Sequence, residues 1–223
     1  MKMFSKISAL AAVAVLSTAF ASADTVTLVS NSGTVGYNGF TASQADTFHT
    51  IGSLSQTFNL DPGTIWTAPV GGSNWVSWDP NSGPTGGQHT GTFDANGTYS
   101  YVSTFTMAAG DTNFSGSLTI MADDTTNVWL NGHEIVFDGN VGGDQHCSDQ
   151  TPNCLTPITI PLSDFITAGT NTIEFNVDQS GSNFQGLDYA LTVTSNVPEP
   201  STLLMLGTGL IGSAGALFRR MRG

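Results

Sequence analysis

Two tryptophan-containing segments carry the side chains best suited to bind a sugar. Trp78–Asn81 lies in a stretch rich in Gly, Pro and Ser, and Trp129 lies in a run of alternating residues. Indole rings offer an apolar surface for sugar C–H faces, and carboxylates and amides offer hydrogen bonds to hydroxyl groups. The carbohydrate-binding residues that we predict are Trp78, Asp79, Asn81 and Trp129. The alternative is that these tryptophans fill the core or its ends.

Sugar hydrolysis would need two carboxylates aimed at one glycosidic oxygen. Glu134 and Glu174 are the only glutamates between residues 24 and 196, and both occupy positions typical of exposed carboxylates. The chain contains neither a Gly-x-Ser-x-Gly nor a His-Glu-x-x-His motif. We therefore predict no catalytic residues, and a secreted carbohydrate hydrolase is kept as an alternative function.

Aspartates gather between residues 123 and 149, where a metal ion could bind. Calcium binds carboxylate, carbonyl and amide oxygens, although the Asp-x-Asp-x-Asp-Gly spacing is absent here. The candidate ligands for a structural calcium ion are Asp123, Asp124, Asp138, Asp144 and Asp149. Alternatively, the Asp123-Asp124 pair braces a turn through hydrogen bonds. No cofactor is required by the sequence.

Cys147 and Cys154 are the only cysteines, and six residues separate them. In an exported chain this spacing predicts a disulfide bond across a short loop. The alternative, a zinc site, lacks a second pair of Cys or His ligands.

The charges are distributed very unevenly along the chain. Residues 24–218 contain all 17 acidic residues and none of the five Lys and Arg residues. Phosphate contacts depend on Lys and Arg, so this charge pattern excludes nucleic acid as a partner. A cation is a suitable counter-charge, but an acidic surface that simply keeps the protein soluble is an equally good explanation.

The elements that must position these residues are β-strands. No stretch between residues 24 and 196 has sustained helical periodicity, whereas bulky and polar residues alternate repeatedly. Asn131-Gly132 predicts a tight hairpin, and Thr67–Gly91 is the longest irregular stretch. We predict an all-β, two-sheet antiparallel β-sandwich. The expected strands are Thr25–Ser30, Leu54–Asn59, Tyr99–Met107, Ser117–Ala122, Asn127–Leu130, Glu134–Phe137, Ile158–Pro161, Thr172–Asp178 and Tyr189–Val193.

The N-terminal segment has the organisation of a signal peptide. Met1–Lys6 is basic, Ile7–Phe20 is apolar, and Ala21-Ser22-Ala23 fits the small-residue rule for cleavage before Asp24. We therefore predict a signal peptide over residues 1–23, with a short uncleaved anchor as the alternative.

The C-terminal segment, residues 197–223, has three parts. Val197–Thr202 contains Pro198, Glu199 and Pro200, Leu203–Phe218 is apolar, and three arginines follow. The apolar part predicts a transmembrane helix with its arginine end on the cytoplasmic side. This order resembles the PEP-CTERM sorting signal, and the resemblance implies processing by an exosortase. A plain membrane anchor is the alternative.

Several motifs from about residue 60 onward resemble the galactose-binding-domain-like jelly roll, which occurs in many carbohydrate-binding modules. These motifs are Trp75–Ser77, Gly97–Tyr101 followed by Thr104–Thr106, Ala122–Asp124 before Val128–Glu134, Ile160–Leu162, Gly169–Ile173 and Leu187–Leu191. The resemblance implies a jelly-roll β-sandwich. It says less about activity, because a fold of this kind serves many functions.

Together these features predict one β-sandwich domain over residues 24–196, exported to the cell envelope or extracellular matrix of a Gram-negative-type bacterium. The predicted function is non-catalytic: the protein binds or organises extracellular polysaccharide at the cell surface or in a biofilm. A purely structural matrix protein is the alternative, in which Trp78 and Trp129 would be buried.

Overall fold

A computed structural model describes residues 23–30, 45–46, 57–79, 81–84, 94–138, 147, 150–181, 183–196, 209, 213 and 219–220. The chain divides into two units, one of residues 24–195 and one that combines residues 1–23 with residues 196–223. The predicted signal peptide, except Ala23, and the motif residues Pro198, Glu199 and Pro200 lie outside the described residues. So does nearly all of the predicted transmembrane segment. Within the described part of the chain, no helix has the length and hydrophobicity needed to cross a bilayer.

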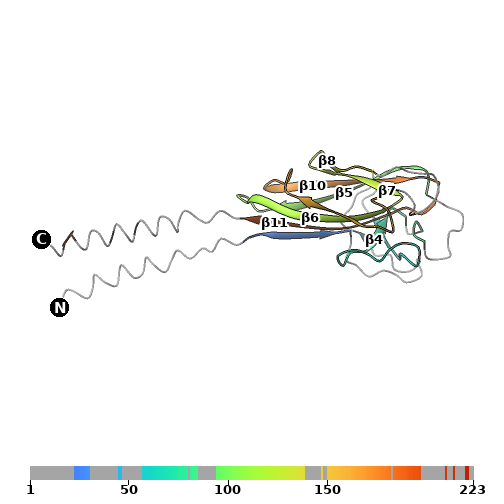
Figure 1. Ribbon diagram of the computed structural model, residues 1–223, viewed down its shortest axis with the longest axis horizontal. Helices are drawn as coiled ribbons and strands as arrows, with labels where there is room; N and C mark the ends of the chain where they lie inside the picture. The colour runs from blue at the N-terminus through green and yellow to red at the C-terminus, as the bar shows by residue number, and fades with distance from the viewer. Residues whose placement is uncertain are drawn as a thin grey trace. The chain divides into compact units, whose positions relative to one another are not determined.

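The body of residues 24–195 consists of two antiparallel sheets that lie one over the other (Figure 1). The seven-stranded sheet has the order β2-β3-β4-β11-β6-β9, with β1 also paired to β11, and the four-stranded sheet has the order β5-β10-β7-β8. The strands are β1 (Thr25–Val29), β2 (Ala45–Asp46), β3 (Thr57–Leu60), β4 (Trp75–Ser77), β5 (Gly97–Met107), β6 (Thr112–Asp123), β7 (Thr125–Leu130), β8 (His133–Val136), β9 (Ile158–Leu162), β10 (Gly169–Gln179) and β11 (Gly186–Asn196). The predicted all-β architecture with two antiparallel sheets is confirmed.

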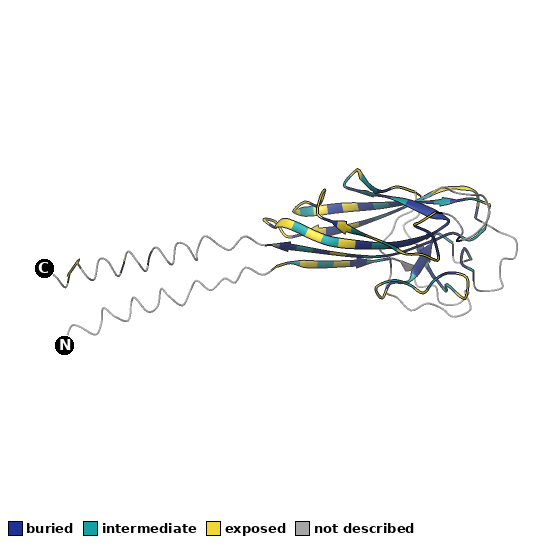
Figure 2. Ribbon diagram, viewed as in Figure 1, coloured by how far each residue is buried: buried dark blue, intermediate teal, exposed yellow. Residues whose placement is uncertain are grey.

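The alternating residues place one face of each sheet in a common core. In β10, Ile173, Phe175 and Val177 are fully buried, whereas Glu174 and Asn176 between them are only half-buried. Figure 2 shows the same alternation as changing colours along the strands. This alternation follows from the two-residue repeat of a strand, which sends neighbouring side chains to opposite faces.

A second buried cluster lies beside the main core and contains the disulfide bond. Leu60, Trp66, Trp75 and Met121 pack there with Cys147 and Cys154. The indole rings of Trp66 and Trp75 are 4.4 Å apart between centroids. The predicted bond between Cys147 and Cys154 is present, and it joins the loop after β8 to this cluster.

The predicted hairpin between β7 and β8 forms at Asn131 and Gly132. Both residues have positive φ angles, 51° and 80°, as a two-residue type I′ turn requires. The Asn131 side chain also accepts a hydrogen bond from the backbone N–H of Thr172 (2.8 Å). It donates one to the carbonyl oxygen of Phe165 (2.7 Å). The turn is therefore held by hydrogen bonds to β10 and to the loop between β9 and β10.

One prediction about the strands needs correction. The stretch 67–91 was expected to be irregular, but it contains the strand β4 at Trp75–Ser77. All three residues of β4 are buried, and such a strand has no alternation of polar and apolar residues to reveal it. Its backbone pairs with β3 and with Leu187 of β11.

Candidate functional site

Trp129 lies between the two glutamates on the outer face of the four-stranded sheet. Glu174 of β10 is its cross-strand neighbour on one side, and Glu134 of β8 is its neighbour on the other. Directly opposite residues in antiparallel strands have Cβ atoms about 4.5–5.5 Å apart. All three side chains are half-buried, so part of the indole and of each carboxylate is open to solvent.

A row of polar side chains continues this face beside Trp129. Asn127 of β7 is paired with Asn176 of β10, and Asn176 is paired with Ser100 of β5. The Ser100 hydroxyl donates a hydrogen bond to the Asn176 side-chain oxygen. We call Ser100, Asn127, Trp129, Glu134, Glu174 and Asn176 the outer-face cluster.

Asp178 and Asp138 extend the acidic character of this face. Partial burial raises the pKa of Asp178, the nearby Asp138 carboxylate raises this pKa further, and a hydrogen bond from the Thr98 hydroxyl opposes the shift. That hydrogen bond is 2.6 Å long. The two carboxylates are therefore close enough to repel each other when both are ionised.

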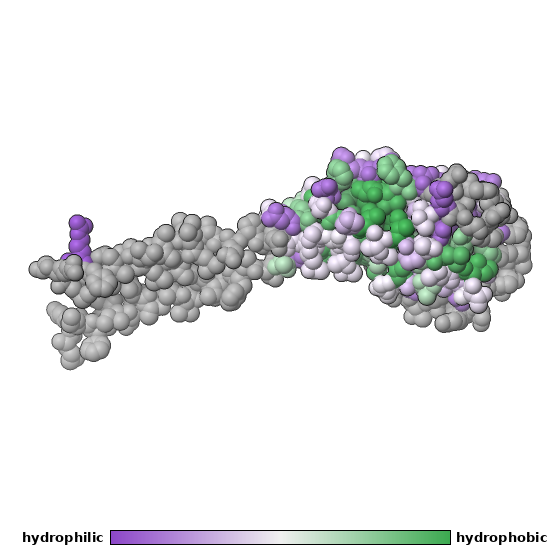
Figure 3. All heavy atoms as spheres, in the orientation of Figure 1, coloured by the Kyte–Doolittle hydropathy of each residue, from purple (hydrophilic) through white to green (hydrophobic). Residues whose placement is uncertain are grey.

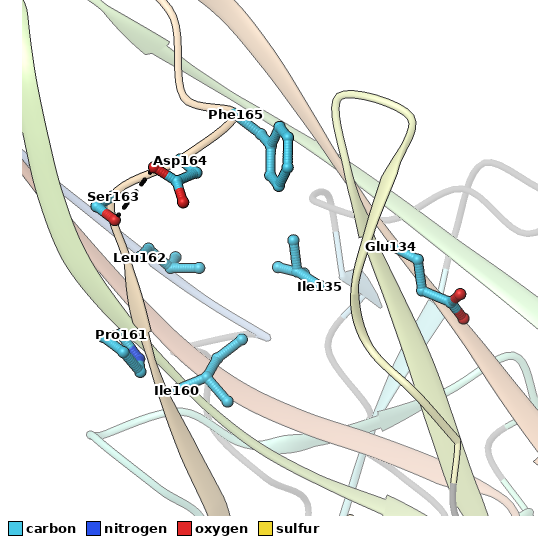
Figure 4. Close-up of a pocket in the computed structure, with 8 residues that line it drawn as sticks. All are labelled: Glu134, Ile135, Ile160, Pro161, Leu162, Ser163, Asp164 and Phe165. Carbon is cyan, nitrogen blue, oxygen red and sulfur yellow. Dashed lines mark hydrogen bonds between the residues drawn. The ribbon is translucent and has the colours of Figure 1, made fainter.

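A groove of about 340 Å³ opens between β8 and the segment 160–165, and Glu134 of the outer-face cluster lies at its border. In Figure 4 the Ile135 side chain points into this groove toward Ile160 and Leu162, whereas Glu134 points away from it. The pairing of β7 with β8 shifts by one residue at this point, so Ile135 is an extra residue and Glu134 stays on the outer face. Apolar atoms gather between β8 and β6 in the space-filling view (Figure 3). The lining of the groove combines these apolar residues with the polar side chains of Ser163 and Asp164.

The structure places Trp78 away from Trp129. The Trp78 ring stacks on Tyr99, with 5.7 Å between ring centroids and 15° between planes. Tyr99 packs against the main core from the inner face of β5, so the two tryptophans lie on opposite sides of this sheet. Trp78 and Trp129 are both half-buried.

Asp79 and Asn81 lie together in the loop after β4. The Asp79 carboxylate accepts hydrogen bonds from the backbone N–H of Asn81 (2.7 Å) and from its side-chain amide (2.9 Å). Asp94, which the sequence pattern did not mark, is buried nearby with a pKa raised to about 7. The largest cause of this raised pKa is the removal of the carboxylate from water.

The predicted calcium ligands that the structure describes each interact with a different partner. Asp123 accepts a hydrogen bond from the Trp66 indole N–H (2.5 Å), and Asp124 accepts one from the backbone N–H of Ser180 (2.6 Å). Asp138 lies next to Asp178. Asp144 and Asp149 are outside the described residues.

Among the described residues, one group of acidic and thiol side chains is compact enough to hold a metal ion. It consists of Asp123, Cys147 and Cys154. Because the two sulfur atoms are joined in the disulfide bond, they are not available as thiolate ligands.

Sequence reasoning found Trp129 but not its relation to the glutamates. Glu134 and Glu174 were each interpreted as isolated surface residues, although both occupy polar-face positions of predicted strands. The order of the strands in the sheet brings the two glutamates to either side of Trp129. The alternation of polar and apolar residues along each strand does not predict which strands are neighbours. No signal in the sequence marks Asp94.

Comparison with known proteins identifies the C-terminal segment. Residues 196–222 match the PEP-CTERM protein-sorting motif, and the sequence prediction of this motif is confirmed. The motif indicates an exported, envelope-directed protein. The match covers the tail alone, so it assigns a sorting signal and does not assign a family to the body. No curated protein matches the chain.

Solved structures similar to the chain include carbohydrate-binding modules. CBM35 from Paenibacillus barcinonensis shares 11% identity at a TM-score of 0.37, covering 75% of this chain and 97% of that chain. A family 35 carbohydrate-binding module from Clostridium thermocellum shares 11% identity at a TM-score of 0.31, covering 78% and 98%. A β-D-glucuronidase from Dictyoglomus thermophilum shares 15% identity at a TM-score of 0.31, covering 46% and 22%. Because these TM-scores lie below 0.5, we base no statement about ligand or activity on them.

Proposed function

We propose that this protein is a non-catalytic, polysaccharide-binding protein of the cell envelope or extracellular matrix of a Gram-negative-type bacterium. Its jelly-roll β-sandwich would bind extracellular polysaccharide through the outer-face cluster and help to organise the cell surface or a biofilm. An exosortase would process its C-terminal segment. The membrane would hold the chain through residues 203–218 until that step.

The observation that carries this proposal is the position of Trp129 between Glu134 and Glu174. An indole that is partly open to solvent can stack on the apolar face of a sugar ring, and carboxylates on both sides can accept hydrogen bonds from its hydroxyl groups. Asn127 and Asn176 add amide groups on the same face. The neighbouring groove has no indole in its lining, which combines Ile135, Ile160 and Leu162 with Ser163 and Asp164.

The negative charge of residues 24–196 limits which polysaccharides we expect the protein to bind. Residues 24–218 have no Lys or Arg to pair with an anionic sugar, and the outer-face cluster itself carries two carboxylates. A polymer rich in uronic acid or sulfate would meet like charge there. Neutral polysaccharides are therefore the expected ligands.

A catalytic role for Glu134 and Glu174 is not favoured by their arrangement. They lie on strands that are separated by β7, and Trp129 stands between them on an open sheet face. Hydrolysis requires two carboxylates that converge on one bond from a shared cleft.

The test measures binding of the purified protein to neutral, amino-sugar and uronic-acid polysaccharides. Neutral polymers should bind saturably, and Trp129→Ala should weaken binding roughly tenfold or more, because about 1.4 kcal/mol of lost stacking suffices for that change. Trp129→Phe should retain part of the affinity. Val102→Ala is the control, since Val102 is a half-buried neighbour of Glu174 on the same face.

Two outcomes would count against the proposal. Saturable binding that is unchanged in Trp129→Ala would move the site away from the outer-face cluster. The absence of binding to every polymer, from a protein that remains folded, would favour the purely structural matrix protein instead.

A further inference from the structure

Three buried oxygen atoms near the loop after β4 have no hydrogen-bond partner. They are Oδ2 of Asp94, Oγ of Ser82 and Oδ1 of Asn81. The side chains of Asp94 and Ser82 are 4% and 3% exposed. Buried polar atoms in native proteins nearly always have a partner, so an exception calls for an explanation such as a bound ion or an ordered water.

The backbone holds these oxygens in one place. The N–H of Gln185 donates to the carbonyl oxygen of Ser82 (3.2 Å), and the N–H of Asp94 donates to the carbonyl oxygen of Asn183 (3.4 Å). The loop after β4 and the residue Asp94 are therefore both attached to the segment 183–185. This attachment brings Asp94 close to Ser82, the chain neighbour of Asn81.

The side-chain amide of Asn81 has a fixed orientation. Its nitrogen donates to Oδ1 of Asp79, so its oxygen must point elsewhere, and that oxygen is the buried one without a partner. Asp79 also brings a second carboxylate near Asp94, where it raises the pKa of Asp94. The Asn81 amide and the Asp94 carboxylate are thus both connected to Asp79, one by a hydrogen bond and the other by charge.

The negative charge of the Asp79 and Asp94 carboxylates is not compensated by a basic side chain. Ser82 and Trp78 lie close enough to lower the pKa of Asp94, but neither side chain makes a hydrogen bond of normal geometry. Burial outweighs their effect and leaves the pKa of Asp94 at about 7. Residues 24–218 contain no Lys or Arg that could neutralise the carboxylates.

We propose that Asp94, Asn81, Ser82 and Asp79 form a binding site for a calcium ion. Two carboxylates, an amide oxygen and a hydroxyl oxygen are ligands that this hard cation prefers, and water or carbonyl oxygens complete its six to eight ligands. Mg²⁺ demands a stricter octahedral geometry and gives up its waters reluctantly. Zn²⁺ prefers the nitrogen and sulfur ligands that these four side chains lack.

This site differs from the one expected among residues 123–149, and it is separate from the outer-face cluster. Its ligands come from the loop after β4 and from the residues just before β5. A bound ion would join these two segments beside the stacked rings of Trp78 and Tyr99. The role that follows is structural, so calcium should stabilise the fold without being required for binding at Trp129.

The test uses the purified full-length protein after treatment with a chelator. Titration with CaCl₂ should give saturable heat in calorimetry and a rise in the thermal midpoint, and MgCl₂ at the same concentrations should give a much smaller rise. Terbium, which replaces calcium in oxygen sites, should show emission on excitation of tryptophan. Trp78→Phe should reduce that emission, whereas Trp129→Phe should not.

Asp94→Asn gives the decisive comparison, because its two effects have opposite signs. It should weaken calcium binding at least tenfold, yet in chelator it should melt no lower than the unsubstituted protein, because it removes an unpaired buried charge. Asp111→Asn is the matched control: Asp111 is equally buried but accepts hydrogen bonds from Ser195 and Ala108. This control should bind calcium normally.

Either of two results would overturn the proposal. One is the absence of any calcium-dependent heat or change in thermal midpoint at millimolar CaCl₂. The other is normal calcium binding by Asp94→Asn, which would place the ion elsewhere, for example among Asp123, Asp124 and Asp138.

Discussion

Asp188 shows how one buried carboxylate can make the stability of this fold depend on pH. Its Oδ1 atom lies 2.9 Å from the Ser30 hydroxyl and also contacts the Ser73 hydroxyl. Its Oδ2 atom accepts a hydrogen bond from the backbone N–H of Val70 (2.8 Å). Removal from water is the main reason why the pKa of Asp188 is raised to about 6.

The two serines can adapt to either protonation state of Asp188, and as donors to the carboxylate they lower its pKa against the larger effect of burial. Each hydroxyl has a single proton and also lies next to a carbonyl oxygen, that of Asn74 for Ser30 and that of Val70 for Ser73. When Asp188 is protonated, it can donate to a serine oxygen while the serine protons go to the carbonyl oxygens. When Asp188 is ionised, the hydroxyl protons turn toward it, and the Val70 carbonyl oxygen keeps the hydrogen bond from the Ser73 backbone N–H (2.9 Å).

We therefore expect the thermal midpoint to fall as the pH rises from about 4 to about 6 and to level off above that range. The folded protein holds the Asp188 proton up to a pKa of about 6, whereas the unfolded chain releases it near 3.8. Between these values the folded state binds more protons than the unfolded state, so stability is highest at low pH and is lost as the pH passes the folded pKa.

Asp188→Asn isolates this effect from the other acidic groups. An amide has the same donor and acceptor arrangement as the protonated carboxyl group, so the variant should match the original protein below about pH 4 and exceed it by several degrees at about pH 7. Thermal melts in chelator at both pH values test this. A variant that keeps the full pH dependence would show that Asp188 is not its source.

At the scale of elements, the close contact of β6 with β11 depends on one glycine. A Cβ atom on Gly116 would lie 2.1 Å from the carbonyl oxygen of Thr192, which is far inside van der Waals contact. Because the obstacle is backbone and not a flexible side chain, the two strands would have to separate.

Gly116→Ala should accordingly destabilise the protein by about 2 kcal/mol or more. For a domain of this size such a loss lowers the thermal midpoint by roughly 4–8 °C. Ser117→Ala, at the next and exposed position of β6, should change it very little. Equal midpoints for Gly116→Ala and Ser117→Ala would mean that the strands have room to adjust.

The strands also show what the sequence could and could not predict. Alternation located β5, β7, β10 and β11, because each has one buried and one polar face. β4 was missed because it is buried on both faces. The Asn131-Gly132 hairpin was predicted from local chemistry alone, since few other residue pairs tolerate two positive φ angles.

The candidate sites were harder to predict, because they depend on which strands are neighbours. The residue types alone suggested Trp129 as a sugar platform. Its placement between Glu134 and Glu174 follows only from β7 lying between β10 and β8. The Asp94 site needs three segments distant in sequence to meet, and no local periodicity records such a meeting.

At the scale of the whole molecule, the sorting motif and the proposed binding site lie in different parts of the chain. The body has its own core and carries the outer-face cluster, whereas the PEP-CTERM motif occupies residues 196–222. All five Lys and Arg residues lie outside residues 24–218. Basic residues are thus confined to the predicted signal peptide and to the sorting motif, where positive charge would set the orientation in a membrane.

Replacement of Pro198, Glu199 and Pro200 by alanine should therefore block processing and leave the body intact. We expect an unprocessed chain in the membrane fraction, held by residues 203–218, whereas the original protein is processed. Immunoblotting of membrane, surface and culture fractions from the producing bacterium measures this distribution. Replacement of the adjacent Ser201 and Thr202 by alanine is the control, because it changes the same polar segment but keeps the motif.

The unprocessed chain, once extracted, should still bind polysaccharide, since none of the altered residues belongs to the outer-face cluster. Normal processing of the triple variant would show that Pro-Glu-Pro is not the recognised feature, and the tail would then act as a plain membrane anchor.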